Sequence, residues 1–172
     1  YYIMNINNFN NISDYLPIFI GAIITDTIII YMNYHSIVFK SEQLTKWYQD
    51  FRLSAGIMDI LIIVLYVLGG RFIVTQLGYK GLISLLLATI VVQVIGDLLF
   101  YYFYESLEPG YKVFDFFTKY SDEVGAHALW SDAIMVSMTV LFGSVFKDLS
   151  LNNQIISLIV SVYIYQYILY LR

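Results

Sequence analysis

The sequence predicts an all-α integral membrane protein, a helical bundle of about five transmembrane helices with one short interfacial helix. Of its 172 residues, 59% are hydrophobic, and the mean hydropathy is +0.70. Only 13% are charged, whereas roughly 25% is usual in soluble domains. Five apolar runs have the length of roughly 17–25 residues with which a helix crosses a bilayer. A chain with so little polar surface needs lipid around its helices.

The apolar runs are typical of helices, because none alternates between apolar and polar residues as a barrel strand would. Pro17 lies in the first turn of the first run, where its missing N–H is tolerated. Gly69, Gly70 and Arg71 are expected to break the second run near its end. The fourth run, the weakest, is open to the alternative that it dips into the membrane and returns. The five predicted spans are residues 16–34, 53–74, 82–104, 127–146 and 151–171.

We expect one domain over residues 16–172, preceded by a polar segment, residues 1–15, of which 5–11 are expected to be disordered or frayed. The loop between the first two spans is partly helical in pattern. The 105–126 connection has one apolar helical face and one charged face, which is typical of a helix lying in the membrane interface. A short helix packed on the rim of the bundle is the alternative. The apolar face contains Val113, Phe114, Phe117, Tyr120 and Val124, and the charged face contains Lys112, Asp115, Lys119, Asp122 and Glu123.

The distribution of basic residues predicts an orientation, because Lys and Arg favour the cytoplasmic side of short loops. With five spans, one side of the membrane holds six basic residues and the other holds three. The six are Lys40, Lys46, Arg52, Lys112, Lys119 and Arg172, and the three are Arg71, Lys80 and Lys147. The difference favours an N-terminus outside and a C-terminus in the cytoplasm.

Each of the first four predicted spans contains one aspartate: Asp26, Asp59, Asp97 or Asp132. An ionisable side chain at such depth costs about 2.5–3.5 kcal/mol or more to insert, so each needs a reason. Asp26 and Asp97 lie eight and seven residues before the ends of their spans, and Asp59 and Asp132 lie six and five residues after the starts. Because successive spans run in opposite directions, all four acids are predicted at roughly 8–12 Å depth below the same membrane face.

Three interpretations of this cluster stay open. Gln93, one turn before Asp97, and His127, near the mouth, join the acids as candidates for a proton or cation site. Crowded carboxyl groups in a low dielectric trade protons, and oxygen ligands suit Ca²⁺ or Mg²⁺. In the second interpretation the acids are hydrogen-bonded to Ser, Thr, Gln and Tyr and lock the bundle. In the third, some acids are hydrated at the interface and have no role.

Several other classes of function lack their sequence signatures. The net charge of −4 argues against nucleic-acid binding, and the absence of Cys excludes disulfides and thiolate metal sites. His35 and His127, the two histidines, are far apart in the sequence. Intramembrane aspartyl proteases carry YD and GxGD motifs, but here Ile95 and Gly96 precede Asp97. No P-loop or HExxH motif occurs, so we expect neither enzyme activity nor a cofactor.

Four stretches resemble an uncharacterised multi-pass membrane protein family of giant viruses, the nucleocytoplasmic large DNA viruses. They are VVQVIGDLLFYYF (91–103), EPGYKVFDFFTKYSDEVGAHALWSDAIMV (108–136), VYIYQYILY (162–170) and LPIFIGAIITDTIIIYMNY (16–34). A His often precedes the Asp of the third span in that family, whereas Gly96 stands here. The resemblance implies a protein of the virion's internal membrane or of a host membrane, and the family carries no established activity.

We therefore expect a virus-encoded multi-pass membrane protein with a membrane-structural or interaction role. The alternative is a small proton or cation channel or transporter that uses the intramembrane aspartates. Expected partners are the lipid bilayer, protons or cations, further copies of this chain and virion proteins. The candidate ion- or proton-binding residues are Asp26, Asp59, Asp97, Asp132, Gln93 and His127.

Overall fold

The computed structural model describes residues 6–37 and 41–171, and this part of the chain is helical without strands. The prediction of an all-α helical bundle is therefore confirmed. Its elements in chain order are η1 (Ile12–Asp14), α1 (Tyr15–His35), α2 (Glu42–Phe51), α3 (Leu53–Gln76), α4 (Leu82–Glu105), α5 (Lys112–Val124), α6 (His127–Lys147) and α7 (Leu151–Leu169).

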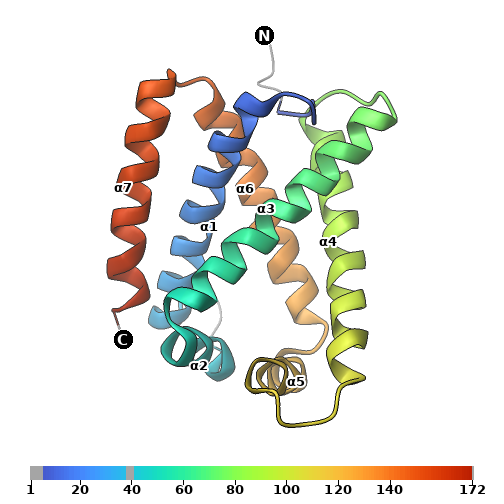
Figure 1. Ribbon diagram of the computed structural model, residues 1–172, viewed down its shortest axis with the longest axis vertical. Coiled ribbons are helices and arrows are strands. Elements are labelled where there is room, and N and C mark those ends of the chain that lie inside the picture. The colour runs from blue at the N-terminus through green and yellow to red at the C-terminus, as the bar shows by residue number, and fades with distance from the viewer. Residues whose placement is uncertain (1–5, 38–40, 172) are drawn as a thin grey trace.

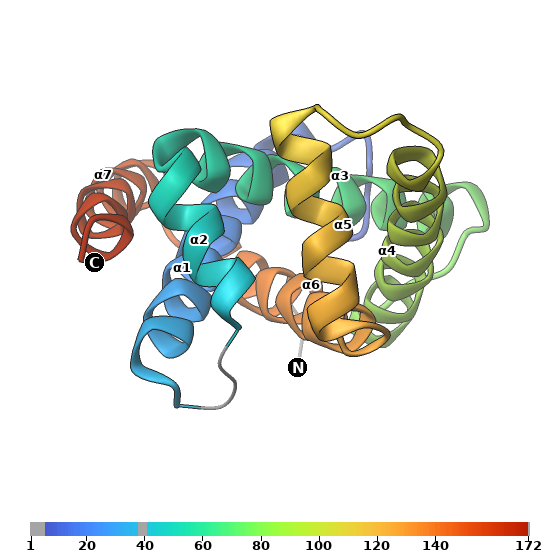
Figure 2. The same ribbon diagram turned by 90° about the horizontal axis from the view of Figure 1, so that it is seen from below.

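The five long helices alternate in direction, and the two short helices lie together at one end of the bundle (Figure 1). α1, α4 and α7 end there, and α3 and α6 begin there. Figure 2, seen from below, shows α2 and α5 lying across this end. We call it the acid end, because the alternation of α1, α3, α4 and α6 brings the four aspartates of the predicted spans toward it.

Four helices are long and apolar enough to cross a membrane: Ile12–His35, Leu53–Gln76, Leu82–Glu105 and His127–Lys147. They correspond to the first four predicted spans. The fifth predicted span forms α7, a continuous 19-residue helix that is not among these four, because Asn152, Asn153, Gln154 and Gln166 lower its hydropathy. A fifth crossing therefore stays a prediction.

The expected break at Gly69 and Gly70 is wrong, because α3 continues without interruption to Gln76. The two glycines instead allow a close crossing between α3 and α4. A Cβ atom on Gly70 would lie 2.3 Å from Thr89 Oγ1, and one on Gly69 would lie 2.8 Å from a methyl carbon of Val92. Small residues at a helix crossing have this effect in membrane bundles. Arg71 consequently lies inside α3 and not in a loop.

Arg71 orders the N-terminal segment, so the expectation that residues 5–11 are disordered or frayed is wrong for residues 6–11; Asn5 lies outside the described residues. Arg71 Nε donates to the Ile6 carbonyl at 2.7 Å, and Nη2 donates to the carbonyls of Asn8 and Asn11. Nη2 also pairs with Asp14 Oδ2 at 3.0 Å, and Lys147 Nζ lies 3.1 Å from Asp14 Oδ1. We call this group, opposite the acid end, the ion-pair end.

The predicted helix in the 105–126 connection exists as α5, and it packs on the bundle. Its most buried side chain is Phe116, whose ring stacks on Trp47 of α2 at 4.7 Å between centroids. Val113, Phe117 and Tyr120 contact the same core cluster, which confirms these three residues of the predicted apolar face, whereas the buried Phe116 was missing from that prediction. On the charged face, Glu123 accepts hydrogen bonds from the first two backbone N–H groups of α2, those of Glu42 and Gln43, and these groups lack partners within their own helix.

Candidate functional site

A cavity of about 700 Å³ opens at the acid end between α3, α4 and α6, and residues of α2 and α5 also line it. It exists because α3 and α4 touch at Gly70 and Thr89 and separate from there toward the acid end (Figure 1). Most of the residues that line it are apolar or aromatic. Three of the four predicted acids lie on its wall: Asp59, Asp97 and Asp132.

Asp26 and Asp59 form the first of two acid pairs, and Tyr48 of α2 joins them. The Tyr48 hydroxyl lies 2.7 Å from Asp59 Oδ2 and 3.1 Å from Asp26 Oδ1. Tyr165 of α7 donates to Asp26 Oδ2 at 2.7 Å, and Trp47 Nε1 donates to Asp59 Oδ2 at 2.9 Å. This network ties α1, α2, α3 and α7 together, and Asp26 is fully buried within it.

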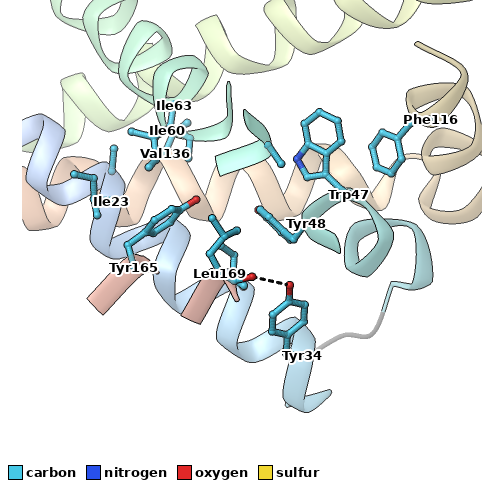
Figure 3. Close-up of a cluster of buried hydrophobic side chains, with 13 residues drawn as sticks. Ile23, Tyr34, Trp47, Tyr48, Ile60, Ile63, Phe116, Val136, Tyr165 and Leu169 are labelled. Carbon is cyan, nitrogen blue, oxygen red and sulfur yellow. Dashed lines mark hydrogen bonds between the residues drawn. The ribbon is translucent and has the colours of Figure 1, made fainter. Parts of the chain in front are cut away.

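The sequence of α2 positions its side chains for these hydrogen bonds. Ser41 caps the helix by accepting a hydrogen bond from the Leu44 N–H at 2.9 Å. Its next turns then direct Trp47 and Tyr48 into the bundle, where Figure 3 shows them beside Phe116 of α5 and near Tyr165 of α7. Both side chains are at most 2% exposed.

Tyr48 remains a neutral hydrogen-bond donor at physiological pH. Its burial, followed by the nearby carboxyl groups of Asp26 and Asp59, raises the pKa of the Tyr48 hydroxyl well above its ordinary value. A phenol carries one proton and donates to one acceptor at a time. The two contacts are both satisfied when Asp26 holds a proton and donates to the Tyr48 oxygen.

Asp97 and Asp132 form the second pair, across the cavity from α4 to α6. Their side chains lie close enough to interact with each other. Asp97 Oδ1 accepts from the Tyr66 hydroxyl at 2.5 Å, and Asp97 Oδ2 accepts from Gln93 Nε2. Two carboxyl groups that interact closely in a buried site favour sharing one proton, because ionising both would place like charges side by side.

No salt bridge reaches any of the four acids within residues 6–37 and 41–171. Their partners are neutral donors: Tyr48, Trp47, Tyr66, Tyr165 and Gln93. Nor do three His, Asp or Glu side chains of the described residues gather closely enough to hold a metal ion. Ca²⁺ takes six to eight oxygen ligands, which is more than either pair of carboxyl groups supplies.

The structure brings together five of the six predicted site residues. Gln93 contacts Asp97 directly, and the four acids meet as two pairs at the acid end. His127 does not join them, because it is the exposed first residue of α6 and does not line the cavity.

The sequence interpretation missed the aromatic donors. Tyr66 lies seven residues after Asp59, so helical spacing places both on one face of α3. This spacing is the signal by which Tyr66 could have been found. Nothing in the spacing relates Tyr48 or Tyr165 to an acid, because they reach Asp26 from other helices.

No known protein family, curated protein or solved structure matches this chain. The resemblance to giant-virus membrane proteins therefore stays a prediction.

Proposed function

We propose that this chain is a multi-pass integral membrane protein that moves protons, with Asp97 and Asp132 as the proton-exchanging pair. The position of these two interacting carboxyl groups on the wall of the cavity supports the proposal. A shared proton on such a pair can leave for the cavity and be replaced from it. A basic partner would instead hold an acid ionised.

The membrane setting is supported by the four long apolar helices. In the proposed arrangement α7 crosses as a fifth helix, and α2 and α5 lie at the membrane face of the acid end. The six basic residues of that side favour the cytoplasm for the acid end. On the other side Arg71 and Lys147 are both bound to Asp14, and Arg71 lies inside a helix. The difference in basic charge between the loops of the two sides is therefore larger.

A membrane-structural role is the second candidate, and the Asp26–Asp59 pair favours it. Each of these acids is hydrogen-bonded to two aromatic side chains of other helices. Such a network locks helices together without any exchange of protons. A lock of this kind would present the exposed surfaces of the bundle to further copies of the chain or to other membrane proteins.

Proton flux into liposomes tests the proposal. The purified chain is reconstituted around a pH-sensitive dye, a pH gradient is applied, and the native protein is compared with the Asp97→Asn/Asp132→Asn double variant. Asp148→Asn serves as the matched control, because Asp148 is an exposed acid in the turn after α6, far from the cavity.

We expect flux above that of empty liposomes for the native chain and the control, and its loss in the double variant. Circular dichroism of the same samples checks that the helices are retained. Native flux equal to that of empty liposomes, over several pH values, would contradict proton movement and leave the structural role.

A further inference from the structure

α4 carries a stripe of polar side chains through the middle of the bundle. Although most of α4 faces outward, Thr89 and Gln93 are fully buried. They precede Asp97 by eight and four residues, so all three lie on one face of the helix. Asp97 lies eight residues from the acid end of α4, and Thr89 lies seven residues from its other end. The stripe therefore covers the most apolar part of the bilayer.

Two atoms of this stripe have no hydrogen-bond partner in the part of the chain that the structure describes, namely Gln93 Oε1 and Thr89 Oγ1. An unpaired polar atom in a protein interior is costly, and buried polar atoms are usually satisfied by protein or by ordered water. Four residues of helix rise about 6 Å, which is close to the length of two hydrogen bonds through one water molecule.

The stripe continues to the ion-pair end. Thr89 packs directly on Gly70, and the next residue, Arg71, is fully buried with its Nη1 also unpartnered within the described residues. Arg71 in turn binds Asp14 at the other end of the bundle. Unpaired polar atoms thus follow one another from the acid pair to the ion pair.

We propose that Gln93, Thr89 and Arg71 line a file of water molecules that carries protons between the Asp97–Asp132 pair and the ion-pair end. This inference rests on the proposed function, since it supplies the route by which protons leave the pair.

The flux assay tests the path with two substitutions at one position. Thr89→Val removes the hydroxyl with little change of volume, and Thr89→Ser keeps it. Ser84→Ala, on the same helix but outside the stripe, is the control, because its hydroxyl already bonds to the Gly81 carbonyl. We expect Thr89→Val to lower proton flux about fivefold or more, and Thr89→Ser and Ser84→Ala to retain it.

A second measurement does not depend on flux. The chain has no Cys, so a single Thr89→Cys substitution supplies one thiol whose access to aqueous Ag⁺ can be measured by its protection from a later thiol label. Val91→Cys is the control, because Val91 is 52% exposed on the outer surface of α4, where lipid would cover it. We expect protection at position 89 and none at position 91.

The outcomes separate the path from the site. Loss of flux in Asp97→Asn/Asp132→Asn with native flux in Thr89→Val would overturn the path and leave the acid pair. Native flux in all of these variants would overturn both. Absence of Ag⁺ protection at position 89 would overturn the path whatever the flux.

Discussion

The two ends of the bundle treat buried acids in opposite ways. At the ion-pair end, Asp14 contacts two basic side chains, Arg71 and Lys147, and is fully buried. At the acid end, Asp97 and Asp132 interact with each other, and Asp97 accepts hydrogen bonds from the neutral donors Tyr66 and Gln93. A basic partner fixes an acid in its ionised form, whereas a second carboxyl group requires a shared proton. The comparison distinguishes an acid that serves structure from acids that can exchange protons.

The largest effect is expected from Arg71→Met. The substitution leaves Asp14 and the carbonyls of Ile6, Asn8 and Asn11 without their buried donor. Removal of one partner of a buried ion pair costs about 3–5 kcal/mol, and we expect that loss in the free energy of unfolding, measured in detergent micelles by circular dichroism. Lys147→Met is the control, with an expected loss below about 1 kcal/mol, because Lys147 is partly exposed. Equal losses in the two variants would contradict the account.

Replacement of one aspartate by asparagine at each end compares the two ends directly. Asp14→Asn removes a buried charge that two basic groups require, and we expect it to lower the free energy of unfolding by about 3 kcal/mol. Asp97→Asn should change it by less than about 1 kcal/mol, because an amide keeps the hydrogen bonds with Tyr66 and with Gln93, whose unpartnered oxygen can turn to accept. Unfolding titrations of both variants measure these changes. A larger loss of unfolding free energy in Asp97→Asn than in Asp14→Asn would contradict the structural role of Asp14 and the exchanging role of Asp97.

Within the acid end, Tyr48→Phe should distinguish the two acid pairs. The substitution removes the hydroxyl that contacts Asp26 and Asp59. We expect about 2 kcal/mol less stability and unchanged proton flux per folded molecule, because Asp97 and Asp132 keep their partners. Tyr163→Phe, whose exposed hydroxyl contacts Tyr167, controls for loss of a phenol. Loss of flux in Tyr48→Phe at retained folding would place the first pair in the proton route.

The smallest effect is expected from His127→Ala. His127 is exposed at the start of α6 and lies outside the cavity. Stability and proton flux should therefore both remain native within the error of the unfolding and liposome assays. A clear loss of flux would restore His127 to the site.

Much of this arrangement follows from the sequence. The length of the apolar runs predicts the long helices, and their alternation predicts that Asp26, Asp59, Asp97 and Asp132 share one end. The pairing of these acids cannot be predicted, because it depends on the tilt that Gly70 permits between α3 and α4. Tertiary packing also decides that Gly69 and Gly70 mark a crossing and not a helix end.

The N-terminal segment shows the same limit. Residues 6–11 are mostly polar in sequence, and their order comes from contacts with Arg71 and Thr75 of α3, at least 60 residues away. Local composition contains no sign of these contacts. The partners of Asp26 on α2 and α7 are likewise distant in sequence, Tyr48 by 22 residues and Tyr165 by 139.

Infrared spectroscopy tests directly whether Asp97 and Asp132 share an exchangeable proton. Protein labelled with ¹³C-aspartate is measured in lipid at neutral pH, and the native spectrum is compared with those of Asp97→Asn and Asp14→Asn. We predict a protonated carboxyl band that shifts in D₂O, disappears in Asp97→Asn and persists in Asp14→Asn. A native spectrum whose protonated carboxyl band is unchanged by Asp97→Asn would contradict the account.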